Sequence, residues 1–187
     1  MKRRSVSVML TVLFSTIFLV GNAQPYRVLT VNDFRGIPRR IGATIAETSC
    51  FVDLKYDVHQ EGNNCQLTFH VALTMDNERS WIDRSRITSA AMLADILKHE
   101  QGHYNISYFE GQELLYTLNR MHFSTNYKAE VEGEFDRIHA KYKQLNADYD
   151  DDTLNSKNSI QQTSWDKYFQ RKLAYQQSAN RTALLQR

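Results

Sequence analysis

The chain has 187 residues, and its 23 lysine and arginine residues nearly balance its 21 aspartate and glutamate residues. This balance, without a basic stripe along the sequence, argues against a nucleic-acid partner. The length suits one domain with a hydrophobic core of its own.

The first 23 residues have the pattern of a secretory signal peptide. Lys2–Arg4 is a basic start, Val6–Val20 is mostly apolar, and Gly21–Ala23 supplies small residues before a cleavage site. The apolar run is short for a membrane span, which favours cleavage over an uncleaved anchor. We therefore expect a signal peptide at residues 1–23 and a single domain at residues 24–187. This domain is expected to be exported, periplasmic or extracellular, with no stable membrane span after cleavage.

Two segments that alternate apolar and polar residues follow an extended lead-in at residues 24–42. Residues 43–58 and 65–75 each place apolar side chains on one face, which predicts antiparallel strands. The segment Gln60–Asn64, which contains a glycine, is the expected turn between them. The first half of the domain is therefore predicted to be a small antiparallel sheet.

The two cysteines, Cys50 and Cys65, would enter an oxidising compartment after export. Such a compartment favours a disulfide over two free buried thiols. A simple hairpin would place Cys65 opposite Val58 rather than opposite Cys50. The expected disulfide would therefore have to reach Cys50 in a bend or in a neighbouring strand.

A long helix is predicted from Ser89 to Arg120, because no proline interrupts this stretch and apolar residues recur at helical spacing. It contains the pattern His-Glu-x-x-His at residues 99–103. Since His99 and His103 lie one turn apart on the same helix face, they can bind one zinc ion. Glu100 can then act as the general base for a metal-activated water. The alternative is an amphipathic helix with two half-buried histidines.

Two further helices are predicted after the zinc motif. Apolar residues at spacings of three and four indicate a helix at Lys128–Asn146, which is followed by the acidic segment Asp148–Asp152. Another helix is expected from about Ser159 to Gln176, with frayed final residues from Ser178 onwards. The predicted fold class is therefore α+β, a small antiparallel β-sheet followed by the long zinc-motif helix and two further helices.

A zinc site needs at least three protein ligands, so two histidines are not sufficient. If the second helix folds back on the first with its turn near Ser124, residues near position 147 come level with the histidines, to within about one turn. This estimate makes Asp150 the candidate third ligand and Asp148 the alternative. A solvated helix end is the competing interpretation of these acidic residues. Tyr149, in the same segment, is a candidate hydrogen-bond donor to an oxyanion.

Four motifs spread along the mature chain carry a family resemblance. They are Leu29-Thr30-Val31-Asn32-Asp33-Phe34-Arg35-Gly36, Ser80-Trp81, His99–Ile106 and Tyr149–Ser156. With these motifs the chain resembles a bacterial domain-of-unknown-function family described as predicted secreted zinc-dependent proteases. The resemblance implies zinc as the cofactor and a peptide or protein as the substrate. One position departs from it, because the family's later histidine, a natural third zinc ligand, is Asn155 here.

Three interpretations of function follow. The first is a secreted zinc-dependent peptidase, in which the two histidines and a third group bind zinc and Glu100 is the general base. The second is a binding or structural protein that keeps the motif without turnover. Asn155 favours it, because an amide oxygen is a poor zinc ligand. The third is a zinc hydrolase acting on a non-peptide bond, such as a cell-wall amide.

Overall fold

The computed structural model describes residues 26–39, 42, 44–61 and 64–185. The expected signal peptide and its cleavage site lie outside these residues. Within them, the strands are β1 (Ala46–Glu47), β2 (Cys50–Glu61), β3 (Asn64–Met75) and β4 (Trp81–Ile82), and the helices are α1 (Ala90–Leu118), α2 (Tyr127–Thr153) and α3 (Ser159–Leu185). Small antiparallel sheets combined with these helices confirm the predicted α+β class.

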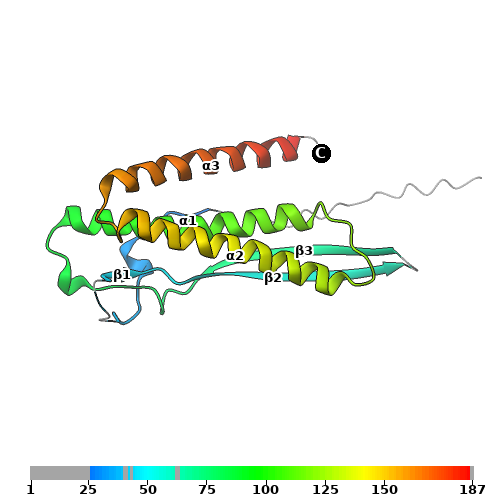
Figure 1. Ribbon diagram of the computed structural model, residues 1–187, viewed down its shortest axis with the longest axis horizontal. Coiled ribbons are helices and arrows are strands. Elements are labelled where there is room, and N and C mark those ends of the chain that lie inside the picture. Colours follow the sequence, from blue (N-terminus) through cyan, green and yellow to red (C-terminus); the bar gives the residue numbers. More distant parts are fainter. Residues whose placement is uncertain (1–25, 40–41, 43, 62–63, 186–187) are drawn as a thin grey trace, which may run out of the picture.

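The elements form three layers (Figure 1). The β2–β3 hairpin lies along one side of the helix pair α1 and α2, and α3 covers the other side of the pair. Phe69 and Leu73 of β3 are buried on the inner face of the hairpin. Helix α1 packs directly on this face, since a Cβ at Gly111 would be in van der Waals contact with Val71, at 3.4 Å. The hairpin thus supports the helix that carries the zinc motif.

Helix α1 begins where the sequence predicts. Ser89 is the N-cap, and its hydroxyl accepts a hydrogen bond from the Met92 amide at 3.1 Å, the usual contact of an N-cap serine. The helix then runs without interruption to Leu118. This long uninterrupted run confirms that the His-Glu-x-x-His pattern is helical, with both histidines on one face.

The register of the β2–β3 hairpin shows whether Cys50 and Cys65 are close enough to form a disulfide. Cys50 pairs with Met75, and the backbone of Cys65 lies opposite Gln60 rather than Val58, because the strands extend further into the turn than expected. With a rise of about 3.3 Å per residue along a strand, the two cysteines are about 30 Å apart. A disulfide needs Cα atoms within about 7 Å of each other. The predicted disulfide within the chain is therefore wrong, and Cys50 is a free thiol.

Helices α2 and α3 are both longer than predicted. Helix α2 continues through the acidic segment to Thr153, because Tyr149 and Thr153 are buried on its inner side. It ends where Leu154 adopts a left-handed conformation with φ of 50°. Helix α3 continues to Leu185, so the fraying expected from Ser178 onwards is wrong for the described part of the helix.

Strands β1 and β4 form a second antiparallel pair, in which Glu47 lies opposite Trp81. The Trp81 indole Nε1 donates a hydrogen bond to Glu47 Oε2 at 2.9 Å, and the ring is buried, as expected for a packing residue. This pair fixes the segment that follows β1. Thr48 in this segment contacts Glu100 of α1.

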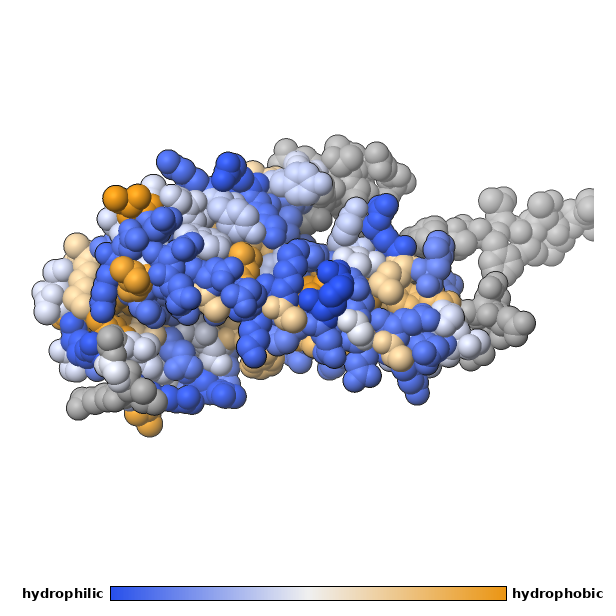
Figure 2. Space-filling model, in the orientation of Figure 1, coloured by the Kyte–Doolittle hydropathy of each residue, from blue (hydrophilic) through white to orange (hydrophobic). Residues whose placement is uncertain are grey.

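The face of the molecule shown in Figure 2 is mostly hydrophilic, with its apolar residues in small separate groups. On α2, the exposed Arg137 donates through Nε to Glu134 Oε2 at 2.9 Å. None of the helices in the described ranges has both the length and the apolar character needed to cross a membrane.

Candidate metal centre

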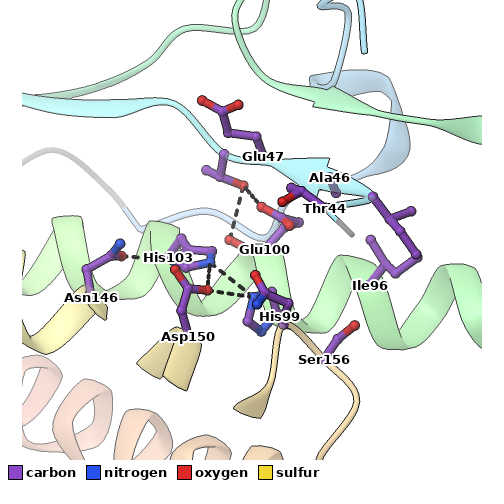
Figure 3. Close-up of a pocket in the computed structure, with 13 residues that line it drawn as sticks. Thr44, Ala46, Glu47, Ile96, His99, Glu100, His103, Asn146, Asp150 and Ser156 are labelled. Carbon is purple, nitrogen blue, oxygen red and sulfur yellow. Dashed lines mark hydrogen bonds and ion pairs between the residues drawn. The ribbon is translucent and has the colours of Figure 1, made fainter. Parts of the chain in front are cut away.

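Two histidines of α1 converge at the centre of the site (Figure 3). His99 is buried, and only 13% of the His103 side chain is exposed. Their Nε2 atoms lie 3.1 Å apart, and the two rings are nearly perpendicular, at 89°. Both Nε2 atoms therefore face one shared location on the inner side of the helix.

Helix α2 folds back along α1 and brings Asp150 to the same location. Asp150 Oδ1 lies 3.2 Å from His99 Nε2 and 3.2 Å from His103 Nε2. The three atoms form a nearly equilateral triangle. A tetrahedral zinc ion with bonds of about 2.0–2.1 Å holds its ligand atoms about 3.3 Å apart. The type and the spacing of these donors thus fit three corners of a tetrahedral metal site.

The other ring nitrogen of each histidine bonds to an acceptor on α2. His103 Nδ1 donates to Asn146 Oδ1 at 2.8 Å. Thr153 donates its hydroxyl proton to the Tyr149 carbonyl at 2.6 Å, so its oxygen is left to accept from His99 Nδ1 at 3.3 Å. Both histidines therefore donate through Nδ1 and turn Nε2 toward Asp150 at the shared location, where Nε2 would have to give up its proton to bind a metal.

One face of α2 thus serves the whole centre. Asn146, Asp150 and Thr153 are spaced by four and three residues, which places them on the same side of the helix. This face supplies the third donor and orients both histidines. The sequence alone does not predict Asn146 and Thr153 as site residues, because the helical pattern of apolar residues stops before the acidic segment. Their i, i+4, i+7 spacing is the signal that could reveal them once the helix is known to continue.

Charge also concentrates at the shared location. Burial lowers the pKa of His103, but its hydrogen bond with Asp150 and the negative charges of Glu100 and Asp150 outweigh burial and raise the pKa to about 9. Burial raises the pKa of Asp150, but its hydrogen bonds with His103 and His99 outweigh burial and hold the pKa below its usual value. The surroundings therefore favour positive charge where the three donors meet.

Glu100 lies beside the triangle. Its carboxylate belongs to a cluster with the two histidines in which all donor atoms lie within 4.8 Å of one another. Glu100 Oε2 accepts a hydrogen bond from the Thr48 hydroxyl at 2.6 Å, and the side chain leaves the helix about 100° around the axis from His99. Asp150, at 3.2 Å from both imidazoles, is the better-placed third donor. Thr48 is a further site residue that the sequence alone does not predict.

Tyr149 does not have the role expected from the sequence. It is fully buried, and its hydroxyl donates to the His99 carbonyl at 3.1 Å and accepts from Gln162 Nε2 at 2.8 Å. Its ring stacks on the His99 ring, with centroids 4.8 Å apart. The predicted donation to an oxyanion is therefore wrong. Because the hydroxyl is bonded to the α1 backbone, Tyr149 instead positions His99.

The glycine of the motif permits this contact. A Cβ at Gly102 would lie 2.6 Å from Tyr149 Cε1 and closer still to the hydroxyl oxygen. Any side chain at this position would push Tyr149 away from His99. In the sequence, Gly102 itself indicates such a close contact. Glycine inside a helix costs about 1 kcal/mol relative to alanine, so its presence there suggests that a larger side chain would not fit.

The three donors open into a cavity of about 410 Å³. Thr48 and the residues of β1 line one side, and Asn155 and Ser156, just beyond α2, line another. Leu154, Asn155 and Ser156 have φ values of 50°, 51° and 73°. Successive non-glycine residues in this region are strained, so the surrounding structure imposes the shape of this loop. Asn155 is one of the residues that line the cavity. It occupies the position at which the family resemblance has a histidine.

Comparison with known families matches residues 32–157 to a family described as bacterial protein of unknown function (DUF922). This span is more than half of the chain and includes His99, Glu100, His103 and Asp150 of the candidate metal centre. The chain belongs to the DUF922 family. The comparisons with curated proteins and with solved structures give no significant match. Membership in DUF922 agrees with the domain-of-unknown-function family inferred from the motifs and carries no assignment of activity.

In this DUF922 protein we expect Asn146→Ala to lower zinc affinity by about 10- to 100-fold, the usual effect of removing a group that orients a ligand. The reason is that His103 Nδ1 would lose its acceptor and the imidazole its fixed orientation. Competition with a chromophoric chelator measures the change. Gln144→Ala is the control, since Gln144 is exposed on the same helix and its side chain donates to Asp148, outside the site. Equal losses in both variants would point to damage to the helix instead.

Proposed function

We propose that this protein is a secreted zinc-dependent peptidase. The main support is the convergence of donors from His99, His103 and Asp150 at mutual distances of 3.1–3.2 Å. A buried carboxylate, Glu100, lies beside them at the wall of a cavity. Two imidazoles and one carboxylate are a common ligand set of catalytic zinc sites. The signal-peptide pattern at residues 1–23 is the basis for secretion.

Zinc supplies Lewis-acid chemistry, since it lowers the pKa of a coordinated water and polarises a carbonyl oxygen. The protein supplies the base. Thr48 holds Glu100 Oε2 through a hydrogen bond of 2.6 Å, whereas Oε1 has no hydrogen-bond partner among the described residues. One oxygen is thus fixed and the other can accept a proton from water and pass it to the leaving amine.

The cavity supports a substrate larger than water. Its volume of about 410 Å³ lies in the range of small-molecule and cofactor sites. Its lining is mainly polar, and it includes β1 and the strained loop after α2. A short stretch of peptide could therefore lie across the three donors with Glu100 beside the scissile bond.

A DUF922 member that binds metal without turnover is the second candidate, and Asn155 is the observation that favours it. In the resemblance this position carries a histidine suited to zinc. However, Asp150 already lies against both imidazoles at 3.2 Å, so the change at residue 155 does not leave the histidines without a third donor. Hydrolysis of a cell-wall amide would use the same residues and differs only in substrate.

Variants of the motif separate these roles. His99→Ala and His103→Ala should each abolish zinc binding, because each removes one of three donors. Glu100→Gln should keep the zinc and lower turnover by about 100- to 10,000-fold, because an amide fits the same space but cannot accept a proton. Elemental analysis measures the zinc, and hydrolysis of unfolded protein substrates measures turnover.

Two outcomes would change the assignment. If Glu100→Gln lost the zinc as the histidine variants do, Glu100 would be a ligand and the base would have to be another group. If the wild-type protein held zinc but cleaved neither peptides nor cell-wall amides, the binding protein would become the better description.

A further inference from the structure

A second, smaller cavity adjoins the metal centre. It has a volume of about 180 Å³, below the range of about 300–1,000 Å³ typical of whole-ligand sites and closer to the size of one side chain. It shares Thr48, His103 and Asn146 with the larger cavity. A peptide held at the metal centre would therefore have one of its side chains next to this space.

A buried carboxylate lines the second cavity. Glu110 is only 7% exposed, and its Oε1 accepts a hydrogen bond from His139 Nδ1 at 2.8 Å. Glu110 Oε2 has no hydrogen-bond partner among the described residues. This oxygen is not among the fully buried side-chain atoms without a partner, so it keeps some accessible surface. Glu110 thus gives the cavity a carboxylate oxygen that no described protein group occupies.

The rest of the lining suits a long side chain with an apolar stem. Cys50, Ile106 and the ring of Tyr142 contribute apolar surface. His139 and Lys143 belong to the exposed side of α2. Since Lys143 is in contact with solvent, water and salt screen its charge more than that of the buried Glu110. Of these two charged residues of the lining, the buried Glu110 therefore has the stronger effect on a bound group.

We propose that this cavity is a specificity subsite that takes a lysine or arginine side chain of a peptide substrate, with Glu110 as the residue that selects it. The stem of such a side chain contacts Ile106 and Cys50, and its ammonium or guanidinium group donates to Glu110 Oε2. The proposal rests on the peptidase function proposed above.

The competing explanation is that Glu110 serves only to join α1 to α2 through His139. The two explanations differ in what happens when His139 is replaced. If the pair is structural, Glu110→Gln and His139→Gln should have the same effect. In the subsite, His139→Gln keeps the carboxylate and therefore keeps the preference for a basic side chain.

The test uses the zinc-loaded full domain and pairs of short peptides that end in a zinc-chelating hydroxamate. Each pair carries lysine or norleucine, which have stems of similar length, at one of the two positions next to the chelating group. At one of these positions the wild-type protein should bind the lysine peptide about tenfold more tightly, the usual effect of a hydrogen bond to a charged group. Glu110→Gln should remove this preference, and His139→Gln should retain it.

Glu113→Gln is the matched control. Glu113 is three residues further along α1, bonds to Lys141 and Tyr142 of α2, and does not line the cavity. This variant should keep the lysine preference. Suppose that zinc is present and that the wild-type protein binds the lysine and norleucine peptides equally well. This result would overturn the subsite but leave the peptidase function standing. Absence of zinc from the protein would overturn the peptidase function and the subsite with it.

Discussion

Asp150→Ala is expected to lower zinc affinity by more than about 100-fold, beyond the 10- to 100-fold typical of groups that only orient a ligand. The carboxylate is the one donor of the triangle that α2 supplies, and it lies 3.2 Å from both imidazoles. Without it two histidines remain, and a zinc site needs at least three protein ligands. Competition with a chromophoric chelator gives the affinities of the wild type and the variant on one scale.

Asp148→Ala provides the control for charge on the same helix. Asp148 is exposed and accepts a hydrogen bond from Gln144 at 2.8 Å, so its removal should leave zinc affinity unchanged. Glu130→Ala should also have no effect, because Glu130 bonds to Ser124 near the start of α2. A large loss with Asp148→Ala and none with Asp150→Ala would show that the third donor is assigned to the wrong residue.

Gly102→Ala is expected to disrupt the metal centre without touching a ligand. The added methyl group would overlap the Tyr149 ring, whose Cε1 would be only 2.6 Å away. Tyr149 would have to move from its stacked position on His99, where the ring centroids are 4.8 Å apart. Overpacking of this kind usually destabilises a core by about 1–3 kcal/mol. We therefore expect a lower unfolding midpoint together with weaker zinc binding.

Gly133→Ala is the matched substitution, since nothing lies within 4 Å of the added Cβ in α2. It should be neutral or stabilise the protein by up to about 1 kcal/mol, the helix preference of alanine over glycine. Thermal unfolding and chelator competition on both variants give the comparison. Wild-type stability and zinc affinity in Gly102→Ala would mean that Tyr149 has room to move and that its contact with His99 is not required.

The parts of the site that follow from local periodicity could be predicted from the sequence. His99 and His103 are four residues apart in a stretch without proline, so a helix necessarily places them on one face. The rise per residue and a short turn also bring Asp150 level with them, because α1 and α2 are both straight and continuous over this distance. These inferences need only the geometry of regular helices.

The remaining features depend on contacts between distant segments. The acidic residues 148, 150, 151 and 152 interrupt the apolar pattern, so the sequence does not show that α2 continues through them. The burial of Tyr149 and Thr153 stabilises this part of the helix. The direction of the Tyr149 hydroxyl depends on Gly102, nearly fifty residues earlier in the chain. The register of the hairpin, which separates Cys50 from Cys65, depends on how far the strands extend into the turn. Local patterns do not contain this information.

The location of the three donors on two helices has a thermodynamic consequence. His99 and Asp150 are 51 residues apart in sequence, so an ion held by both closes a long loop and acts as a cross-link between α1 and α2. An unfolded chain cannot hold the donors together, and the free energy of metal binding therefore adds to the free energy of unfolding. At a free zinc concentration 100 times the dissociation constant, the added stability is about 2.7 kcal/mol. A chelator should consequently lower the unfolding temperature even though it touches no residue of the core.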